Sequence, residues 1–212
     1  MPLPDPSGLL VRAPVVPVLT IERIADAVPL ARALVAGGLP VLEVTLRTPV
    51  ALEAARAIAS EVPQAVVGIG TVTDMPDIRL ALSAGAKFLV SPGTPPALAA
   101  ALARIPVPVL PGCATVSEAM ALAALGFPVL KFFPAEAAGG TGFLKTIAAP
   151  LPGAKFCPTG GIDQRTAQSY LALPNVVAIG GSWPAPRDAI SAGDFARITQ
   201  SAQEAAALRR AP

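Results

Sequence analysis

The sequence places an amine where an apolar strand is expected. Lys131 lies within the apolar stretch Val129–Glu136, and the whole chain contains only four lysines. Side chains alternate between the two faces of a strand, so Lys131 shares a face with Phe133. A buried lysine loses solvation, its pKa moves towards neutrality, and the neutral amine can attack a ketone. The alternative is a lysine at a strand end that extends to solvent or pairs with a carboxylate.

A second set of polar side chains lies in the expected strand Val41–Arg47. Alternation places the apolar and polar positions on opposite faces, with Leu42, Val44 and Leu46 on one face and Glu43, Thr45 and Arg47 on the other. Barrel interiors are normally filled with branched apolar side chains, so polar residues facing the interior need a function. An internal Glu–Arg pair is the structural alternative, but buried ion pairs add little net stability.

These features together predict Schiff-base chemistry on an α-keto acid. A low-pKa lysine forms the imine, a nearby carboxylate transfers protons, and an arginine binds the carboxylate of the keto acid through two hydrogen bonds. Thr71 ends the next expected strand and could add a hydroxyl contact, or could instead cap a helix.

Paired glycines follow the last two expected strands, in Thr159-Gly160-Gly161 and Gly180-Gly181-Ser182. Glycine allows close approach of the backbone, and exposed N–H groups near a helix start can bind an anion. In barrels the phosphate site commonly follows strands seven and eight. The sequence therefore predicts a phosphorylated substrate.

The elements that position these residues alternate between strands and helices about every 20–25 residues, as in β/α repeats. The expected strands are Val15–Thr20, Val41–Arg47, Val66–Val72, Phe88–Gly93, Val107–Ala114, Val129–Glu136, Lys155–Ile162 and Val176–Ser182. The expected helices are Ile24–Ala36, Pro49–Glu61, Pro76–Ala84, one that begins at Pro95 and Pro96, one that opens with Thr115–Glu118 as a capping box, Phe143–Ala149, one capped by Asp163 that ends at Leu171, and Asp194–Arg210.

Eight such units predict an α/β fold of the (β/α)8 TIM-barrel class, as a single domain over residues 1–212. Residues 1–14 form a lead-in with a short helix around Ser7–Arg12. A doubly wound open sheet is the alternative, but no dinucleotide-type glycine loop follows the first strand.

Composition excludes several classes of function. The hydrophobic fraction is 53%, yet glycine, proline or a charge interrupts every apolar run, so we expect no membrane span. A net charge of +2 without interleaved aromatic and basic residues argues against nucleic acid. Cys113 and Cys157 are isolated, and the start of the chain lacks the pattern of a secretory signal, so a reducing cytoplasm is expected. The chain has no histidine, which excludes Ser-His-Asp and Cys-His catalysis and predicts that no metal is required.

Seven short motifs in this chain resemble those of the 2-keto-3-deoxy-6-phosphogluconate (KDPG) aldolases, many of which also split 4-hydroxy-2-oxoglutarate. The motifs are Glu43–Thr48, Gly70–Val72, Ser91–Gly93, Pro111–Gly112, Lys131–Glu136, Cys157–Ile162 and Ile179–Trp183. The resemblance runs from about Val15 to the last helix.

The resemblance implies a class I aldolase of the Entner–Doudoroff pathway that cleaves 2-dehydro-3-deoxy-6-phosphogluconate to pyruvate and glyceraldehyde 3-phosphate. It implies a homotrimer with no cofactor and no metal. Lys131 would form the Schiff base and Glu43 would be the general acid and base. The implied binding residues are Arg47, Thr71, Pro92 and Phe133 for the pyruvate half, and Thr159, Gly160, Gly161, Gly180, Gly181 and Ser182 for the phosphate and the distal part of the substrate.

Other functions fit parts of this pattern. The same machinery could act mainly on 4-hydroxy-2-oxoglutarate or on the phosphogalactonate epimer. A non-catalytic phosphosugar-binding barrel would have no use for a buried amine, and a metal-dependent sugar-phosphate epimerase would lack its histidine ligands.

Overall fold

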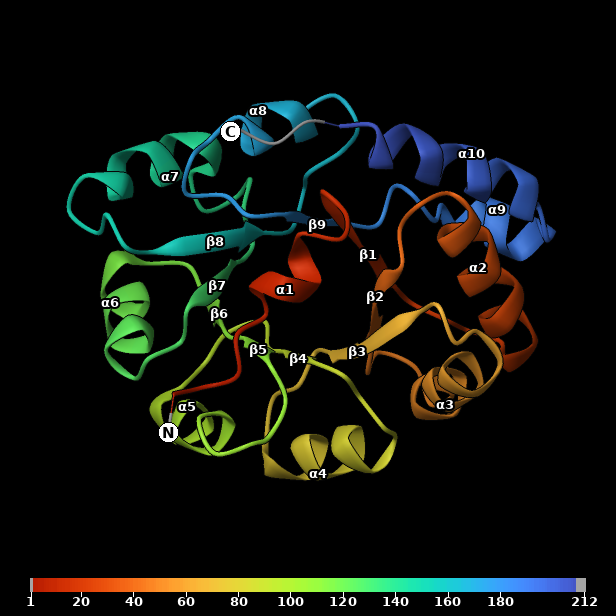
Figure 1. Cartoon of the computed structure of the whole chain (residues 1–212), viewed down its shortest axis with the longest axis horizontal. Helices are drawn as coiled ribbons and strands as arrows, with labels where there is room; N and C mark the ends of the chain where they lie inside the picture. The colour runs from red at the N-terminus through yellow and green to blue at the C-terminus, as the bar shows by residue number, and fades with distance from the viewer. Residues whose placement is uncertain (1, 209–212) are drawn as a thin grey trace.

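Parallel strands circle a common centre, and helices surround them, in a computed structural model that describes residues 2–208 (Figure 1). The strands are β1 (Val15–Leu19), β2 (Val41–Thr45), β3 (Val66–Gly70), β4 (Leu89–Val90), β5 (Val109–Leu110), β6 (Gly112–Cys113), β7 (Val129–Phe132), β8 (Lys155–Pro158) and β9 (Ile179–Gly181). They form one sheet in the order β5-β4-β3-β2-β1-β9 and another in the order β6-β7-β8. The protein thus has an α/β fold with a parallel, curved sheet.

Backbone hydrogen bonds and bridges join the two sheets at both of their edges. Single bridges pair Phe156 with Val176 and Thr159 with Gly180, which brings β8 beside the segment of β9. At the other edge the Lys131 N–H donates to the carbonyl of Pro111, between β5 and β6. Proline has no N–H to donate, so Pro111 interrupts the ladder, and the expected strand Val107–Ala114 appears as two short strands.

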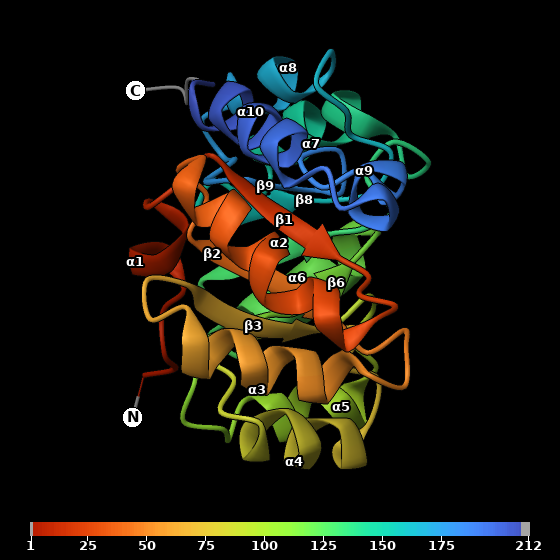
Figure 2. The same cartoon turned by 90° about the vertical axis from the view of Figure 1, so that its right-hand side faces the viewer.

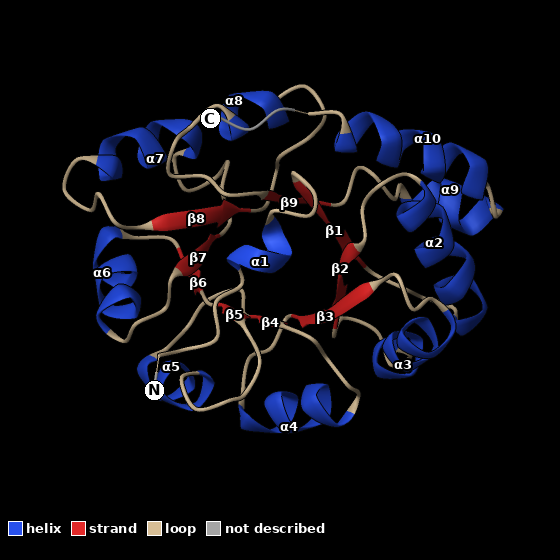
Figure 3. Cartoon of the chain, in the orientation of Figure 1, coloured by secondary structure: helices blue, strands red, loops and turns tan. Residues whose placement is uncertain are grey.

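The helices lie outside the strands, apart from α1 (Figure 3). Their bounds are α1 (Ser7–Leu10), α2 (Ile24–Ala36), α3 (Ala51–Glu61), α4 (Met75–Ser83), α5 (Pro96–Leu102), α6 (Val116–Ala124), α7 (Gly140–Ala148), α8 (Ala167–Leu171), α9 (Arg187–Ala192) and α10 (Phe195–Ala206). Within residues 2–208, none of them has the length and apolar character needed to cross a bilayer.

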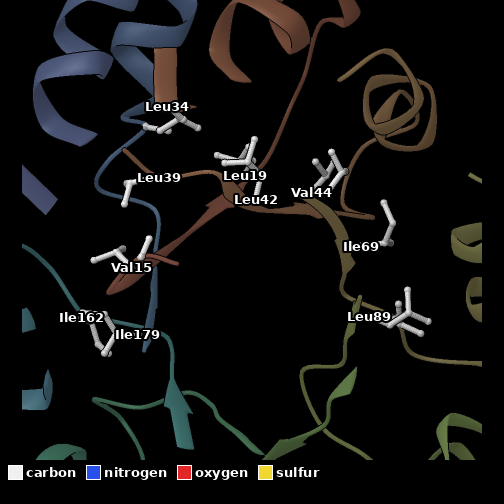
Figure 4. Close-up of a cluster of buried hydrophobic side chains, with 14 of the residues drawn as sticks. Val15, Leu19, Leu34, Leu39, Leu42, Val44, Ile69, Leu89, Ile162 and Ile179 are labelled. Atoms are coloured by element: carbon white, nitrogen blue, oxygen red, sulfur yellow. The ribbon is translucent and has the colours of Figure 1, made fainter. Parts of the chain in front are cut away.

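Apolar residues fill the space between the strands and the helices. Figure 4 shows part of this cluster, where Leu34 of α2 lies near Leu19 of β1 and Leu42 of β2. Leu42 and Val44 belong to this outer cluster, as the alternation of β2 predicts. Burying a leucine side chain contributes roughly 1.5–3 kcal/mol, so this layer holds each helix against its strand.

A second apolar cluster fills one end of the ring of strands. Leu10 of α1 packs there with inward-facing residues such as Val41, Phe88 and Val129. Figure 2 shows α1 at the end of the ring where the strands begin. The polar side chains of the interior lie further along the strands, towards their carboxyl ends.

The helix boundaries test the signals in the sequence. α2 has the predicted bounds, and Thr115 and Glu118 form the predicted capping box of α6. The Asp163 carboxylate accepts hydrogen bonds from the N–H groups of Arg165 and Thr166, but it caps a turn, because α8 begins only at Ala167.

The predicted helix Asp194–Arg210 also differs from the helices that the structure shows in this part of the chain. Gly193, with a φ of +69°, separates α9 from α10, and the side chain of Asp194 caps α10. The helix α9 was missed. α10 ends at Ala206, and the predicted end at Arg210 lies outside the described residues.

Candidate functional site

A buried ion pair spans the interior of the ring. The Lys131 Nζ of β7 donates to the Glu43 Oε1 of β2 at 3.2 Å, and each side chain is only 4% exposed. These strands are not neighbours in the sheets, so the pair joins opposite parts of the fold. Glu43 pairs with Lys131, and Arg47 makes no ion pair within the described residues, so the Glu–Arg alternative is wrong.

Small residues leave room for this pair. In the register of the strands, Glu43 lies beside Gly68, and Lys131 lies between Gly112 and Cys157. A Cβ at Gly70 would overlap the Glu43 carboxylate. The glycines of β3 therefore allow a carboxylate to lie inside the ring, where a branched apolar side chain is usual.

Cys157 is not an alternative nucleophile in this interior. Burial raises the pKa of its thiol to about 12, and the Glu43 carboxylate adds to the rise while the Lys131 ammonium opposes it. A thiol with this pKa is protonated at neutral pH, and only the thiolate is nucleophilic.

Arg47 follows the end of β2 and is exposed. The predicted strand ended at Arg47, whereas β2 ends at Thr45, whose hydroxyl donates to the carbonyl of Leu19 at 2.8 Å. Beyond that bond the chain turns, and Arg47 extends into the wall of a cavity of about 330 Å³.

This cavity brings together most of the residues predicted at strand ends. It is lined by Val18, Thr20, Arg47, Phe133, Thr159, Gly160, Gly161, Ile162, Gly181, Ser182, Trp183, Ala185, Pro186, Arg187 and Ile190. The charged members of this set are the two arginines, and it contains no carboxylate. Such a wall favours an anionic ligand.

Phe133 connects the ion pair to the cavity. Its ring lines the cavity, and its centroid lies 5.2 Å from the Lys131 Nζ. Lys131 and Glu43 are not themselves in the cavity wall. The amine thus lies behind an aromatic side chain that a ligand in the cavity would contact.

The Gly160–Gly161 turn has a backbone that other residues rarely adopt, with φ of +102° and +79°. Glu136 supports it, since its N–H donates to the carbonyl of Gly160 at 3.0 Å. The hydroxyl of Tyr170 donates to the Glu136 carboxylate. Burial raises the pKa of Tyr170, and the Glu136 carboxylate raises it further.

Besides Lys131 and Glu43, three of the predicted site residues lie outside the cavity wall, namely Thr71, Pro92 and Gly180. A Cβ at Gly180 would overlap the Thr159 hydroxyl, so this glycine permits close packing of two strand ends. Thr71 has a φ of +63°, which is uncommon outside glycine. It does not cap a helix, because Asp74 caps α4.

Sequence reasoning missed Arg187 and Trp183 as cavity residues. Trp183 follows the Gly-Gly-Ser motif directly, and Arg187 is five residues beyond Ser182. The sequence signal that points to Arg187 is a cation soon after the glycine pair of a predicted anion site. It lies in a segment for which the sequence predicts neither a helix nor a strand.

Comparisons with known proteins agree with this geometry. Residues 7–201 match the family model described as KDPG and KHG aldolase. The chain is 50% identical over 198 residues to the KHG/KDPG aldolase of Escherichia coli K12, an alignment that covers 93% of each chain.

Two solved structures are also similar. The KDPG aldolase of Legionella pneumophila, with pyruvate captured at low pH as a covalent carbinolamine intermediate, has a TM-score of 0.93 and 43% identity over 96% of this chain and 98% of that one. The 2-keto-3-deoxy-6-phosphogluconate aldolase of Zymomonas mobilis ZM4 with 3-phosphoglycerate has a TM-score of 0.90 and 48% identity over 97% of each chain. On the match over residues 7–201 and the 50% identity to the Escherichia coli relative, the chain belongs to the KDPG and KHG aldolase family.

Proposed function

We propose that this protein is a class I aldolase that cleaves 2-dehydro-3-deoxy-6-phosphogluconate to pyruvate and glyceraldehyde 3-phosphate. The observation that carries the proposal is the buried Lys131–Glu43 pair, 3.2 Å apart, behind the aromatic wall of a cavity with two arginines. The Legionella relative carries pyruvate as a covalent carbinolamine, which is the first adduct of such a mechanism.

The reaction begins when Glu43 takes a proton from the Lys131 ammonium and the free amine attacks the C2 ketone. Glu43 returns the proton to the carbinolamine hydroxyl, water leaves, and an iminium forms. Arg47 binds the substrate carboxylate with two hydrogen bonds. Phe133 and Pro92 pack against the pyruvate half, and Thr71 contributes a hydroxyl.

The iminium then accepts the electrons of the C3–C4 bond. Glu43, through a bound water, takes the proton of the C4 hydroxyl, the bond breaks, and glyceraldehyde 3-phosphate leaves. The remaining enamine is protonated at C3, and water hydrolyses the imine to release pyruvate and the Lys131 amine. Because the enamine is stabilised covalently, the reaction as proposed uses no metal and no other cofactor.

The other end of the cavity binds the phosphate. Thr159, Gly160, Gly161, Gly181 and Ser182 provide hydroxyl and N–H donors there, and their strands end side by side. Gly180 supports this end through its contact with Thr159. The Zymomonas relative was solved with 3-phosphoglycerate, a small phosphorylated acid, which supports a phosphorylated substrate.

A second activity on 4-hydroxy-2-oxoglutarate is part of the proposal, because its keto-acid half would make the same contacts with Lys131, Glu43 and Arg47. We also infer that residues 1–212 form a single (β/α)8 barrel domain of the TIM type, in which β5 and β6 together form the fifth strand. We propose that it assembles as a homotrimer in a reducing cytoplasm, where Cys113 and Cys157, both free and buried, stay reduced.

Trapping with borohydride tests the mechanism. Incubation with pyruvate and sodium borohydride should reduce the imine and leave a stable 1-carboxyethyl group on the Lys131 amine, which peptide mass mapping would locate. Lys131→Ala should give no adduct and no pyruvate release in a coupled assay. Lys145→Ala, at an exposed position of α7, is the matched control and should behave as wild type. An adduct on another lysine, or activity in Lys131→Ala, would refute the assignment.

A further inference from the structure

We propose that Arg187 determines the preference of this enzyme for a phosphorylated substrate by binding the terminal phosphate. The inference rests on the proposed aldolase function and adds a cation to the phosphate end of the same cavity. Neither a paired glycine nor a strand end marks this residue in the sequence.

Arg187 begins α9, in the segment that follows β9. It lines the main cavity together with Gly160, Gly161 and Ser182, which are the proposed phosphate donors. It also lines a smaller cavity of about 160 Å³, with Thr20 in both walls. Arg187 therefore lines both cavities, and in the main one it shares the wall with the Gly160–Gly161 turn.

The guanidinium of Arg187 has no partner among the described residues. Its neighbour Asp188 is engaged by Arg197, at 2.6 Å between Nη1 and Oδ2. Asp26, in the wall of the smaller cavity, accepts two hydrogen bonds from Arg23. Asp26 and Asp188 are thus engaged by other arginines, and Glu22, the other carboxylate in the wall of the smaller cavity, makes no ion pair with Arg187. Within the described residues the guanidinium of Arg187 is therefore available to a ligand.

Two uncompensated arginines in one cavity fit a substrate with two anionic ends. Arg47 follows β2, the strand that carries Glu43, which places it with the keto-acid half. Arg187 follows β9, the strand that ends in the Gly181–Ser182 donors. A planar guanidinium forms paired hydrogen bonds with a phosphate, and a phosphate monoester carries nearly two negative charges at neutral pH.

The test compares two substrates in wild type, Arg187→Gln and Arg187→Lys. The ratio of kcat/KM for 2-dehydro-3-deoxy-6-phosphogluconate to that for 4-hydroxy-2-oxoglutarate should fall about tenfold in Arg187→Gln, the size expected for one lost solvent-exposed contact between a cation and a dianion. The loss should appear in KM and should shrink as salt screens the charge. Arg187→Lys should retain part of the preference, because it keeps the charge but not the fork.

Arg56→Gln, an exposed position on α3 outside both cavities, is the matched control and should leave the ratio unchanged. An equal loss on both substrates, or no loss, would overturn the inference. Calorimetry with inorganic phosphate does not depend on turnover: affinity should fall about tenfold in Arg187→Gln, and equal affinities would contradict the inference. If wild type turned over neither substrate, the proposed function would fail, while calorimetry would still decide the role of Arg187.

Discussion

Replacing Gly161 by alanine tests whether the Gly160–Gly161 turn, the proposed phosphate site, depends on its support from Glu136. A Cβ at Gly161 would lie 2.7 Å from the Cβ of Glu136, whereas ordinary van der Waals contact begins at 3.4 Å. The Glu136 Cβ cannot swing away, because the backbone of Glu136 is bound to Gly160 and its carboxylate to Tyr170. The turn itself must therefore shift by roughly 0.7 Å.

Two costs follow from this change, and a matched glycine separates them. Alanine at a φ of +79° costs about 1–2 kcal/mol from backbone strain alone. Gly85 has a φ of +82° and nothing within 4 Å of its Cβ position, so Gly85→Ala carries the same strain without the clash. In urea denaturation Gly85→Ala should show the strain alone, and Gly161→Ala should lose at least as much stability, because it adds the clash.

Only Gly161→Ala should lose activity. A displacement of 1 Å at a binding contact can cost on the order of a hundredfold in rate, so a shift of roughly 0.7 Å should lower kcat/KM on the phosphorylated substrate at least tenfold. A coupled assay for pyruvate measures this. The reasoning would be refuted if Gly161→Ala and Gly85→Ala had the same kcat/KM.

Three further predictions concern parts of the fold outside the cavity. Thr115→Ala should lower the free energy of unfolding by about 1 kcal/mol, because it removes the cap of α6; a change below about 0.2 kcal/mol would contradict this. The N–H of Ala114 donates to the Glu118 carboxylate and holds the pKa of Glu118 below its usual value. The stability that the Glu118 carboxylate contributes to the fold is therefore present above about pH 4.3 and lost as pH falls further. Urea titrations should therefore show Glu118→Gln less stable than wild type at pH 7, with the gap closing in acid. Burial raises the pKa of Cys113 and Cys157 to about 12, so iodoacetamide at pH 8 should label both only after unfolding.

The faces on which the polar side chains of the strands lie could be predicted, because side chains alternate strictly between the two faces of a strand. In β2 the apolar positions Leu42 and Val44 mark the outward face, so the pattern predicts that Glu43 lies inward. β7 is apolar on both faces, so alternation predicts only that Lys131 shares a face with Val129. Helix ends could also be predicted where the residues that cap them are close in the sequence. The glycine pair that ends α2 and the capping box of α6 satisfy backbone groups within a few residues of themselves.

Features that depend on distant contacts were not predictable in this way. Pro111 lacks the N–H that would continue the ladder, but the sequence does not show that the residues on its two sides pair in different sheets. Thr71 adopts a positive φ, a conformation that the type of residue does not predict. The strand predicted to end at Arg47 ends at Thr45; the Leu46 N–H still donates to the carbonyl of Gly70, and Arg47 lies beyond this last bond.

The residues that could be predicted and those that could not lie on different kinds of element in the proposed site. The reactive pair is carried on strands, where burial and register hold two side chains 3.2 Å apart. The cations at the cavity are carried on segments that follow strands, so their positions depend on how each loop turns. Loops change without disturbing the strand ladder, and Arg187 lines the cavity from the first residue of α9, beyond the segment that follows β9. In the proposed function, the ring of strands therefore carries the groups that break the bond, whereas the segments that follow the strands carry the groups that select the substrate.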